Sequence, residues 1–250
     1  MDTTSQTPEA TAVNRDGLWP MPPGPPHEEA HIAQSPLLRD FVHGAADGPV
    51  LPFALALGLS GAAIGTAPII VAGLAAAVAG GIAVGLRGYL ATCDAADHYA
   101  AERRKEEEET VEYVDRERWE VAAILHRYGV RGDALHLAVD SICADQRRWV
   151  DFMMRFELDL KEPEPQRAAA CAVTTGGGHL LAGLIPVAPL LVDGGALAVS
   201  GALTGAALAV FGWLRARANG MPPLRGAMQT LATGAVAAAA AFIVARAVGG

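Results

Sequence analysis

The sequence is poor in the residues that build large soluble cores or covalent frameworks. Only 6% of its 250 residues are aromatic, and it has three cysteines, Cys93, Cys143 and Cys171. The cysteines are far apart and follow neither a CxxC spacing nor the framework of a disulfide-rich domain. Because 52% of the residues are nevertheless hydrophobic, Ala, Gly, Val and Leu supply most of the apolar content. This profile favours helices packed in lipid through small residues.

The chain also lacks an excess of basic residues. Its formal charge is -8, and between Asp94 and Arg167 there are 19 acidic against 12 basic residues. An acidic surface repels the phosphate backbone of DNA and RNA. The sequence therefore predicts no nucleic-acid partner.

The first 36 residues contain little that a core could bury. They are rich in Pro, Thr, Ser and Glu around "WPMPPGPP", and such a segment cannot offset its chain entropy by burial. We expect residues 1–36 to be a disordered tail. Within it, "HEEAH" at 27–31 fits the zinc-protease pattern, but no catalytic domain surrounds the motif. His27 and His31 remain candidates for weak metal capture.

Five long apolar segments follow the tail, and each is near the roughly 20 residues that span a bilayer. They cover residues 48–66, 68–91, 169–192, 195–214 and 227–248. A soluble bundle of Ala-rich helices is the alternative, but five such segments favour an all-α integral membrane protein with five transmembrane helices. The predicted domains are the tail (1–36), helices 1–2 (37–93), a charged helical domain (94–166) and helices 3–5 (167–250).

Basic residues flank these segments unevenly. Lys and Arg lie before the first segment, after the second, and between the fourth and fifth, whereas "SGAAIGTAP" and "VDGG" contain none. The positive-inside rule therefore places the N-terminus and the charged domain in the cytoplasm and the C-terminus on the other side.

The charged domain contains paired carboxylates. In "AERRKEEEETVEYVDRERWE", Glu106 and Glu109 are three residues apart, as are Glu117 and Glu120. Residues at this spacing are neighbours on one helical face, so each pair is suited to binding a divalent cation. A Glu-rich helix is also a common solvated surface, and that alternative stays open.

A later stretch, "WVDFMMRFEL", adds a different ligand type. Met153 and Glu157 are four residues apart, which places a thioether beside a carboxylate on one helix. Oxygen together with sulfur suits a borderline transition ion such as Fe²⁺ better than Ca²⁺ or Mg²⁺. Packing of Met153 beside Phe152 and Phe156 is the alternative interpretation.

Several stretches resemble successive signatures of the vacuolar iron transporter family. They are "LRDFVHGAADGPVLPFALALGLSGA", "GLAAAVAGGIAVGLRGYLATCDAADHYAAERRKEEEE", "WVDFMMRFEL" and "AGLIPVAPLL", in the family's order over residues 36–250. The resemblance implies a homodimer with five transmembrane helices per chain and a cytoplasmic helical metal-binding domain between helices 2 and 3. It also implies Fe²⁺ or Mn²⁺ as the transported ion and no prosthetic group.

By similarity, six residues of the charged domain match the family's metal ligands in identity and spacing. They are Glu106, Glu109, Glu117, Glu120, Met153 and Glu157. The resemblance thus favours ligation over a plain solvated face.

Two aspartates precede the first apolar segment. Asp40 and Asp47 are seven residues, about two turns, apart and would share one helical face. Ionisable groups at membrane depth usually line a cation or proton path, and in the resembling family these positions belong to the ion path at the dimer interface. Pro49 and Pro52 should distort the helix there. A helix cap before Gly48 is the alternative for Asp47.

The sequence departs from the family pattern in the second and third helices. Ala76 and Val84 stand where the family typically has Glu and Met, and His179 stands where it often has Tyr. A neutral histidine binds metals or accepts a proton, while a hydrogen-bonded structural role is at least as plausible. The first two departures remove one hard and one soft ligand.

Together these features predict a transporter that exports Fe²⁺ or Mn²⁺ from the cytoplasm in exchange for protons, in a bacterial plasma membrane. A membrane-anchored metal buffer or sensor that has lost transport is the alternative. A di-iron oxidase is disfavoured because no Glu-x-x-His pair occurs in the charged domain. We therefore expect no enzymatic activity.

Overall fold

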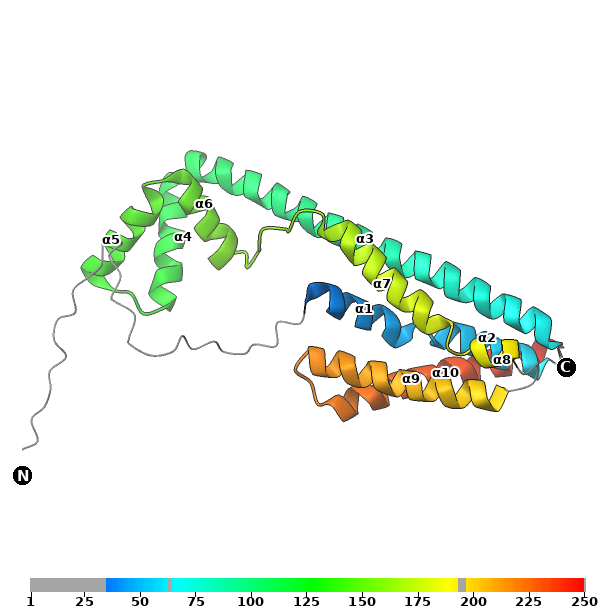
Figure 1. The fold of residues 1–250 in the computed structure, drawn as a ribbon. Coiled ribbons are helices and arrows are strands. Elements are labelled where there is room, and N and C mark those ends of the chain that lie inside the picture. Colours follow the sequence, from blue (N-terminus) through cyan, green and yellow to red (C-terminus); the bar gives the residue numbers. More distant parts are fainter. Residues whose placement is uncertain (1–34, 63, 193–196, 250) are drawn as a thin grey trace, which may run out of the picture. The chain divides into compact units, whose positions relative to one another are not determined.

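A computed structural model describes residues 35–62, 64–192 and 197–249, and every regular element within them is a helix (Figure 1). These elements are α1 (Pro36–Asp47), α2 (Val50–Gly61), α3 (Thr66–Glu112), α4 (Val114–Arg127), α5 (Gly132–Cys143), α6 (Gln146–Phe156), α7 (Arg167–Gly183), α8 (Ala188–Val192), α9 (Leu197–Ala218) and α10 (Pro223–Gly249). The predicted all-α class is confirmed for these residues. Nearly all of the predicted tail, including "HEEAH", lies outside them.

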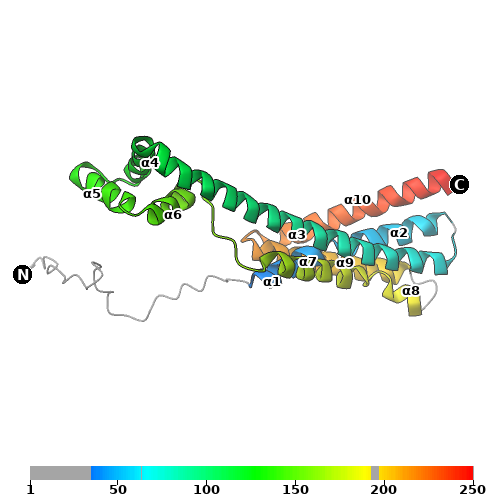
Figure 2. The ribbon, with the colours of Figure 1, turned by 90° about the horizontal axis from the view of Figure 1, so that it is seen from above.

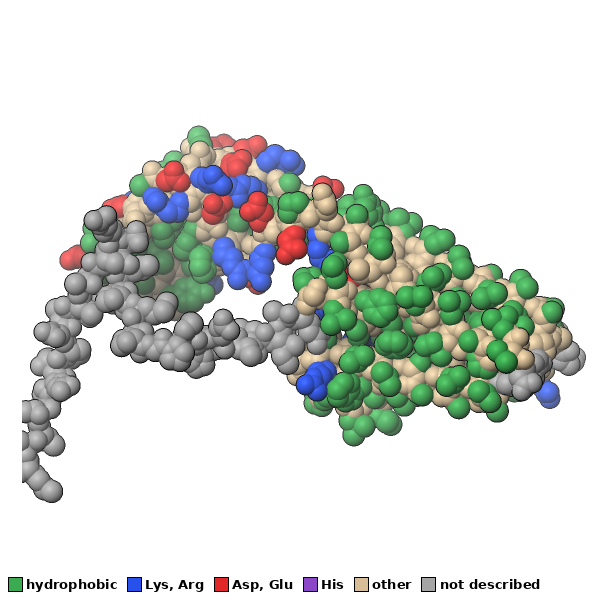
Figure 3. Space-filling view, in the orientation of Figure 1, with side chains coloured by type: hydrophobic (Ala, Val, Ile, Leu, Met, Phe, Trp, Pro, Cys, Tyr) green, Lys and Arg blue, Asp and Glu red, His purple; other side chains and the backbone are tan. Residues whose placement is uncertain are grey.

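Four stretches of the described chain are long and apolar enough to cross a membrane. They are Pro36–Gly61, Thr66–Glu112, Leu197–Ala218 and Pro223–Val248. Hydrophobic side chains cover much of the visible surface of this part of the chain (Figure 3). For example, Val71 and Ile82 of α3 are 66% and 67% exposed. Water-soluble monomers rarely expose such continuous apolar surface, which agrees with an integral membrane protein.

The predicted span at 169–192 differs from the other four. It falls on α7, which has 17 residues, and on the five-residue α8, with a turn between them. Pro186 lies in this turn and has no N–H to continue a helical ladder. The described residues therefore contain four candidate spans where the sequence predicted five.

The first span is interrupted where prolines were expected to disturb it. α1 ends at Asp47 and α2 begins at Val50, with Gly48 and Pro49 between them. The Gly48 N–H still donates to the Gly44 carbonyl at 3.2 Å, so the chain keeps nearly its helical course. Asp47 is thereby the last residue of a helix inside an apolar stretch.

Helix α7 packs against α1 and α3 with the backbones in contact, and both views show it beside them (Figures 1 and 2). A Cβ added at Gly44 of α1 would lie 1.9 Å from the Thr175 carbonyl oxygen. One added at Gly178 would lie 2.3 Å from the Phe41 oxygen, and one at Gly176 would lie 2.7 Å from the Gly81 oxygen of α3. Small residues permit this approach in membrane helices.

Helix α3 continues far beyond a bilayer. Its 47 residues correspond to roughly 70 Å, against about 30 Å of hydrocarbon. From Asp94 onward its sequence is dominated by charged and polar residues. Only the first half of α3 is therefore suited to lipid, and the second half belongs with α4, α5 and α6.

The helices α4, α5 and α6 share a small core that includes Val121, Val139 and Met153. Asp145 caps α6, because its side chain accepts from the Arg148 N–H at 2.8 Å. The group is attached to α3 by an ion pair from Arg103 Nη1 to Asp151 Oδ1 at 2.7 Å. The charged half of α3 and these three helices together present most of the acidic residues.

The contact between α1 and α7 allows a matched test. Gly44→Ala should force the two helices apart and destabilise the protein by about 1–3 kcal/mol, the usual cost of overpacking. Gly177→Ala on α7 has no atom within 4 Å of the added Cβ, so it should leave stability unchanged or slightly raised. Thermal unfolding in detergent, followed by size-exclusion chromatography, measures both. Equal melting temperatures for the two variants would contradict the packing described here.

Candidate functional site

Six side chains predicted as metal ligands come from three elements that pack together, α3, α4 and α6. Glu106 and Glu109 lie on the last turns of α3, Glu117 and Glu120 on α4, and Met153 and Glu157 at the end of α6. We refer to these six residues as the acidic cluster.

The centre of the acidic cluster is buried without hydrogen-bond partners. Met153 is 0% exposed, Glu117 is 1% exposed and Glu106 is 3% exposed. Neither carboxylate oxygen of Glu117, nor Oε2 of Glu106, has a hydrogen-bond partner in the structure. Burying a carboxylate without a partner is costly. These two groups therefore need either a proton or a cation.

The carboxylates also repel one another, which shows that they are close. Burial, and after it the charges of Glu157, Glu117 and Glu109, together raise the pKa of Glu106 to about 7. Burial likewise raises the pKa of Glu117 to about 7, with Glu120 and Glu109 as the next causes. The pKa of Glu157 is raised by burial, then by Glu120 and Glu109.

The outer members of the cluster are balanced by nearby cations. Arg116 Nε lies 3.2 Å from Glu120 Oε1, and Lys105 Nζ lies 3.9 Å from Glu109 Oε2. Both pairs are on the surface and contribute little to stability. Within the described ranges no three His, Cys, Asp or Glu side chains are already arranged to hold an ion. The cluster is thus a set of neighbouring acids whose oxygens have not converged.

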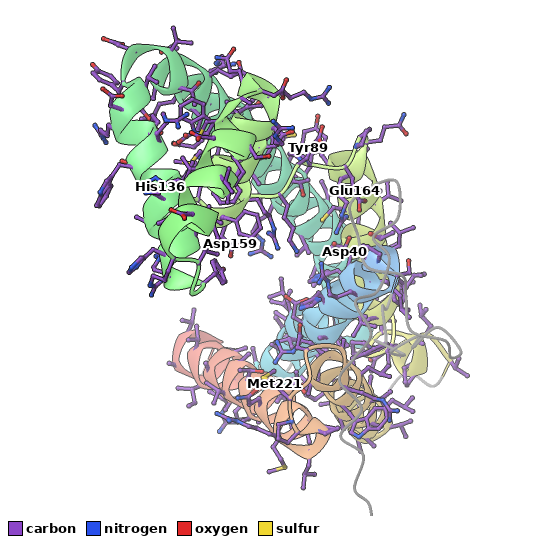
Figure 4. All side chains as sticks on the ribbon, turned by 90° about the vertical axis from the view of Figure 1, so that its left-hand side faces the viewer. Asp40, Tyr89, His136, Asp159, Glu164 and Met221 are labelled. Carbon is purple, nitrogen blue, oxygen red and sulfur yellow. The ribbon has the colours of Figure 1, made fainter. Side chains whose placement is uncertain are left out.

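A second group of predicted residues lies where α1 meets α7. Asp40 is buried, and its Oδ2 lies 2.6 Å from Arg167 Nη1 at the start of α7 (Figure 4). Asp47 Oδ1 lies 3.2 Å from His179 Nδ1, further along α7. Both aspartates therefore contact the same helix, as their seven-residue spacing predicted. Sequence reasoning missed Arg167, because nothing local links it to Asp40.

His179 bridges α1 and α3. Its side chain is buried, with Nδ1 directed at Asp47 and Nε2 without a hydrogen-bond partner. A Cβ at Gly80 of α3 would lie 2.4 Å from Nε2, so the ring occupies space that the glycine leaves open. When Nδ1 carries the proton and donates it to Asp47, Nε2 has a free lone pair.

A cavity of about 950 Å³ adjoins this pair. Asp47 and His179 line it from one side, and Arg215, Gln229 and Thr230 line it from α9 and α10. The Asp47 side chain is 58% exposed in the single chain. In the sequence, Arg215 contributes only to the group of basic residues between the fourth and fifth apolar segments, which predicts on which side of the membrane that connection lies. The place of Arg215 in the cavity depends on the packing of α9 and α10, which no local pattern reveals.

The sequence matches the VIT family over residues 38–246. The chain belongs to the VIT family. "Vacuolar iron transporter 1" of Tulipa gesneriana is 40% identical over 225 residues, covering 89% of this chain and 91% of that relative. "Vacuolar iron transporter 1" of Arabidopsis thaliana is also 40% identical over 225 residues, covering 89% and 90%. "Protein CCC1" of Saccharomyces cerevisiae is 34% identical over 158 residues, covering 61% and 48%.

The resemblance drawn from the sequence motifs is confirmed by these matches. The plant relatives carry names of transporters, which agrees with the expectation that this VIT family member is not an enzyme. The relatives named here come from plants and a yeast, so they lend no support to a bacterial plasma membrane.

Ala76 and Val84, the two α3 positions at which the sequence was expected to depart from the family pattern, lie on either side of Gly80 along the helix. Ala76, Gly80 and Val84 of α3 are spaced by four residues and therefore follow one side of the helix. Gly80 is in reach of His179. In this VIT family member, the side of α3 that faces the histidine thus carries two aliphatic residues and a glycine.

The raised pKa values of Glu106 and Glu117 give a pH dependence of stability. The folded protein holds these protons up to about pH 7, whereas an ordinary glutamate has a pKa of 4.5. Between these values the folded state binds more protons than the unfolded chain, so stability falls as pH rises through this window. We expect the melting temperature of the metal-free protein to fall as pH is raised from about 5 to about 8.

The matched variants are Glu117→Gln and Glu108→Gln, since Glu108 is exposed on α3. Glu117→Gln should flatten the dependence because its amide does not ionise, whereas Glu108→Gln should keep it. If both variants followed the same curve, the unpartnered buried charge would not be its cause.

Proposed function

We propose that the chain is a divalent transition-metal transporter that moves Fe²⁺ or Mn²⁺ out of the cytoplasm in exchange for protons. One observation carries the proposal: the carboxylates of Glu106 and Glu117 are buried without hydrogen-bond partners, and burial and the charges of neighbouring glutamates raise the pKa of both. Membership of the VIT family and the names of the plant relatives support iron as cargo. No prosthetic group is needed for this activity.

Ion capture begins at the acidic cluster. A divalent ion would draw the carboxylate oxygens of the cluster together. It would also replace the protons that Glu106 and Glu117 hold near neutral pH. The thioether of Met153 adds a soft ligand, which favours Fe²⁺ and Mn²⁺ over Mg²⁺. Glu109, Glu120 and Glu157 complete the proposed ligand set.

The transport path runs past Asp40, Asp47 and His179. Asp47 supplies negative charge beside the cavity, and the free Nε2 of His179 supplies a lone pair for a metal or a proton. A dication crossing a membrane needs such groups, because hydrocarbon stabilises no charge. Asp40 is held by Arg167, so a passing ion must compete with that guanidinium.

A homodimer would complete this path. An exposed carboxylate on an apolar helix would face lipid in a single chain, and ionisable groups in membranes face protein or water instead. A second copy packed over Asp47 removes that cost and fits the two-fold symmetry usual for oligomers. The distribution of Lys and Arg supports a cytoplasmic N-terminus and acidic domain, with the C-terminus on the other side.

The alternative function is a membrane-anchored metal buffer or sensor. It is favoured by one observation, the aliphatic Ala76 and Val84 on the side of α3 that contains Gly80, the neighbour of His179. The two functions share the acidic cluster and differ in whether an ion passes Asp47.

The acidic cluster is tested by metal titration. Glu117→Gln with Glu120→Gln should abolish most Mn²⁺ binding to the full-length protein in detergent, measured by calorimetry at about pH 7.5. Met153→Leu should weaken Mn²⁺ and Fe²⁺ binding more than Mg²⁺ binding, since it removes the sulfur and keeps the volume. Glu108→Gln is the control on the exposed side of α3. Unchanged Mn²⁺ binding by the double variant would sink the ligand assignment.

The transport path is tested by flux in proteoliposomes with an imposed pH gradient. Asp47→Asn should keep metal binding at the acidic cluster and stop flux, because the amide has similar size but no charge. If the wild type showed no metal flux and the double variant Ala76→Glu with Val84→Met did, the result would favour the buffer or sensor. Equal flux by wild type and Asp47→Asn would rule out the path.

A further inference from the structure

A second pocket, of about 510 Å³, lies where α3, α6 and the segment after α6 meet. It shares no lining residue with the acidic cluster or with the cavity beside Asp47. Its charged lining residues are Arg103, Arg147, Arg155, Lys161, Asp151 and Glu162. Within a chain of net charge -8, this pocket has four cationic residues against two acidic ones.

The pocket has a defined shape because the chain folds back at the end of α6. The Leu160 N–H donates to the Met154 carbonyl at 2.9 Å, and Asp159 adopts a left-handed backbone with φ of 51°. Asp159 Oδ1 also accepts from Arg155 Nη1 at 3.1 Å (Figure 4 labels Asp159). Lys161 therefore lines the pocket together with residues of α6, among them Met154, which is 2% exposed.

Two acids at the pocket, Asp151 and Asp159, are paired with two of the four cations, and the third, Glu162, forms no ion pair within the described residues. Asp151 pairs with Arg103, which also donates to the Tyr99 hydroxyl at 3.3 Å, and Asp159 pairs with Arg155. Arg147 and Lys161 form no ion pair with any described residue. Over the part of the chain that contains α6, Lys and Arg side chains lie interspersed with Asp and Glu side chains (Figure 3). Two unpaired cations thus line one pocket whose other cations are fixed in place.

We propose that this pocket binds a phosphate group, held by Arg147 and Lys161 with Arg103 and Arg155 beside them. A guanidinium presents a planar fork of donors that matches phosphate oxygens, and Lys adds a point charge. The volume suits a small anion or a lipid headgroup. The group can belong to a soluble diphosphate or to an anionic lipid, and the chemistry at the pocket is the same.

The four cationic residues of the pocket come from three separate segments of the chain. Arg103 comes from α3, Arg147 and Arg155 come from α6, and Lys161 comes from the segment leading to α7. A phosphate bound by all of them would connect that segment to the end of the acidic domain. This site is independent of metal binding, and its test does not depend on transport.

Native mass spectrometry of the full-length protein in metal-free detergent tests the proposal. The probes are inorganic pyrophosphate and a short-chain phosphatidylinositol 4-phosphate, with phosphatidylcholine as the neutral lipid. We expect the wild type to bind at least one phosphate probe, and Arg147→Gln with Lys161→Gln to reduce the bound fraction about tenfold or more. Arg127→Gln, an exposed basic site on α4, should bind as the wild type does.

The two probes distinguish the sources of the phosphate. Binding of the lipid alone identifies a headgroup site, and binding of pyrophosphate alone identifies a soluble ligand; either result supports the pocket. The melting temperature of the double variant is measured alongside, and Lys161→Gln alone carries the test if that variant unfolds. Wild type that binds neither probe, or equal binding by the wild type and the charge-removal variant, overturns the proposal.

Discussion

Direct contact of α7 with the backbones of α1 and α3 is the constraint on which the membrane part of the structure depends. It requires glycine at Gly44 toward α7 and at Gly176 toward α3, where a Cβ would lie 1.9 Å and 2.7 Å from a carbonyl oxygen. Because the helices are this close, one histidine ring on α7 reaches both Asp47 and Gly80. Larger residues at these contacts would separate the helices and with them the groups that face the cavity.

Four of the apolar segments predicted from hydropathy fall on helices that are long and apolar enough to cross a membrane. The span predicted at 169–192 is not confirmed, because the chain there forms the 17-residue α7 and the five-residue α8 with a turn containing Pro186 between them. The seven-residue spacing of Asp40 and Asp47 correctly predicted a shared side of α1. It did not reveal Arg167, since an ion pair between residues 127 positions apart is set by tertiary packing.

In the acidic cluster, too, the sequence predicts which residues are neighbours on a helix but not which of them are buried by packing between helices. Spacing by three residues placed the glutamates in pairs on helices, and the structure has those helices. Spacing could not show that Glu106 and Glu117 are buried while Glu108 is exposed, because burial depends on how α3, α4 and α6 pack together. Their proposed roles as ligands rest on this burial, on the missing hydrogen-bond partners and on the chain's membership of the VIT family.

Helix α3 has a mechanical consequence because it runs without a break from Thr66 to Glu112. Gly80, which touches His179, and Glu106, in the acidic cluster, are on the same rod and about 39 Å apart along its axis. If an ion drew the glutamates together at one end, a rigid α3 would tilt at the other end, and a tilt of about 5° displaces a point at that distance by about 3 Å. The unbroken α3 would therefore connect a movement at the carboxylates to Gly80, the neighbour of His179.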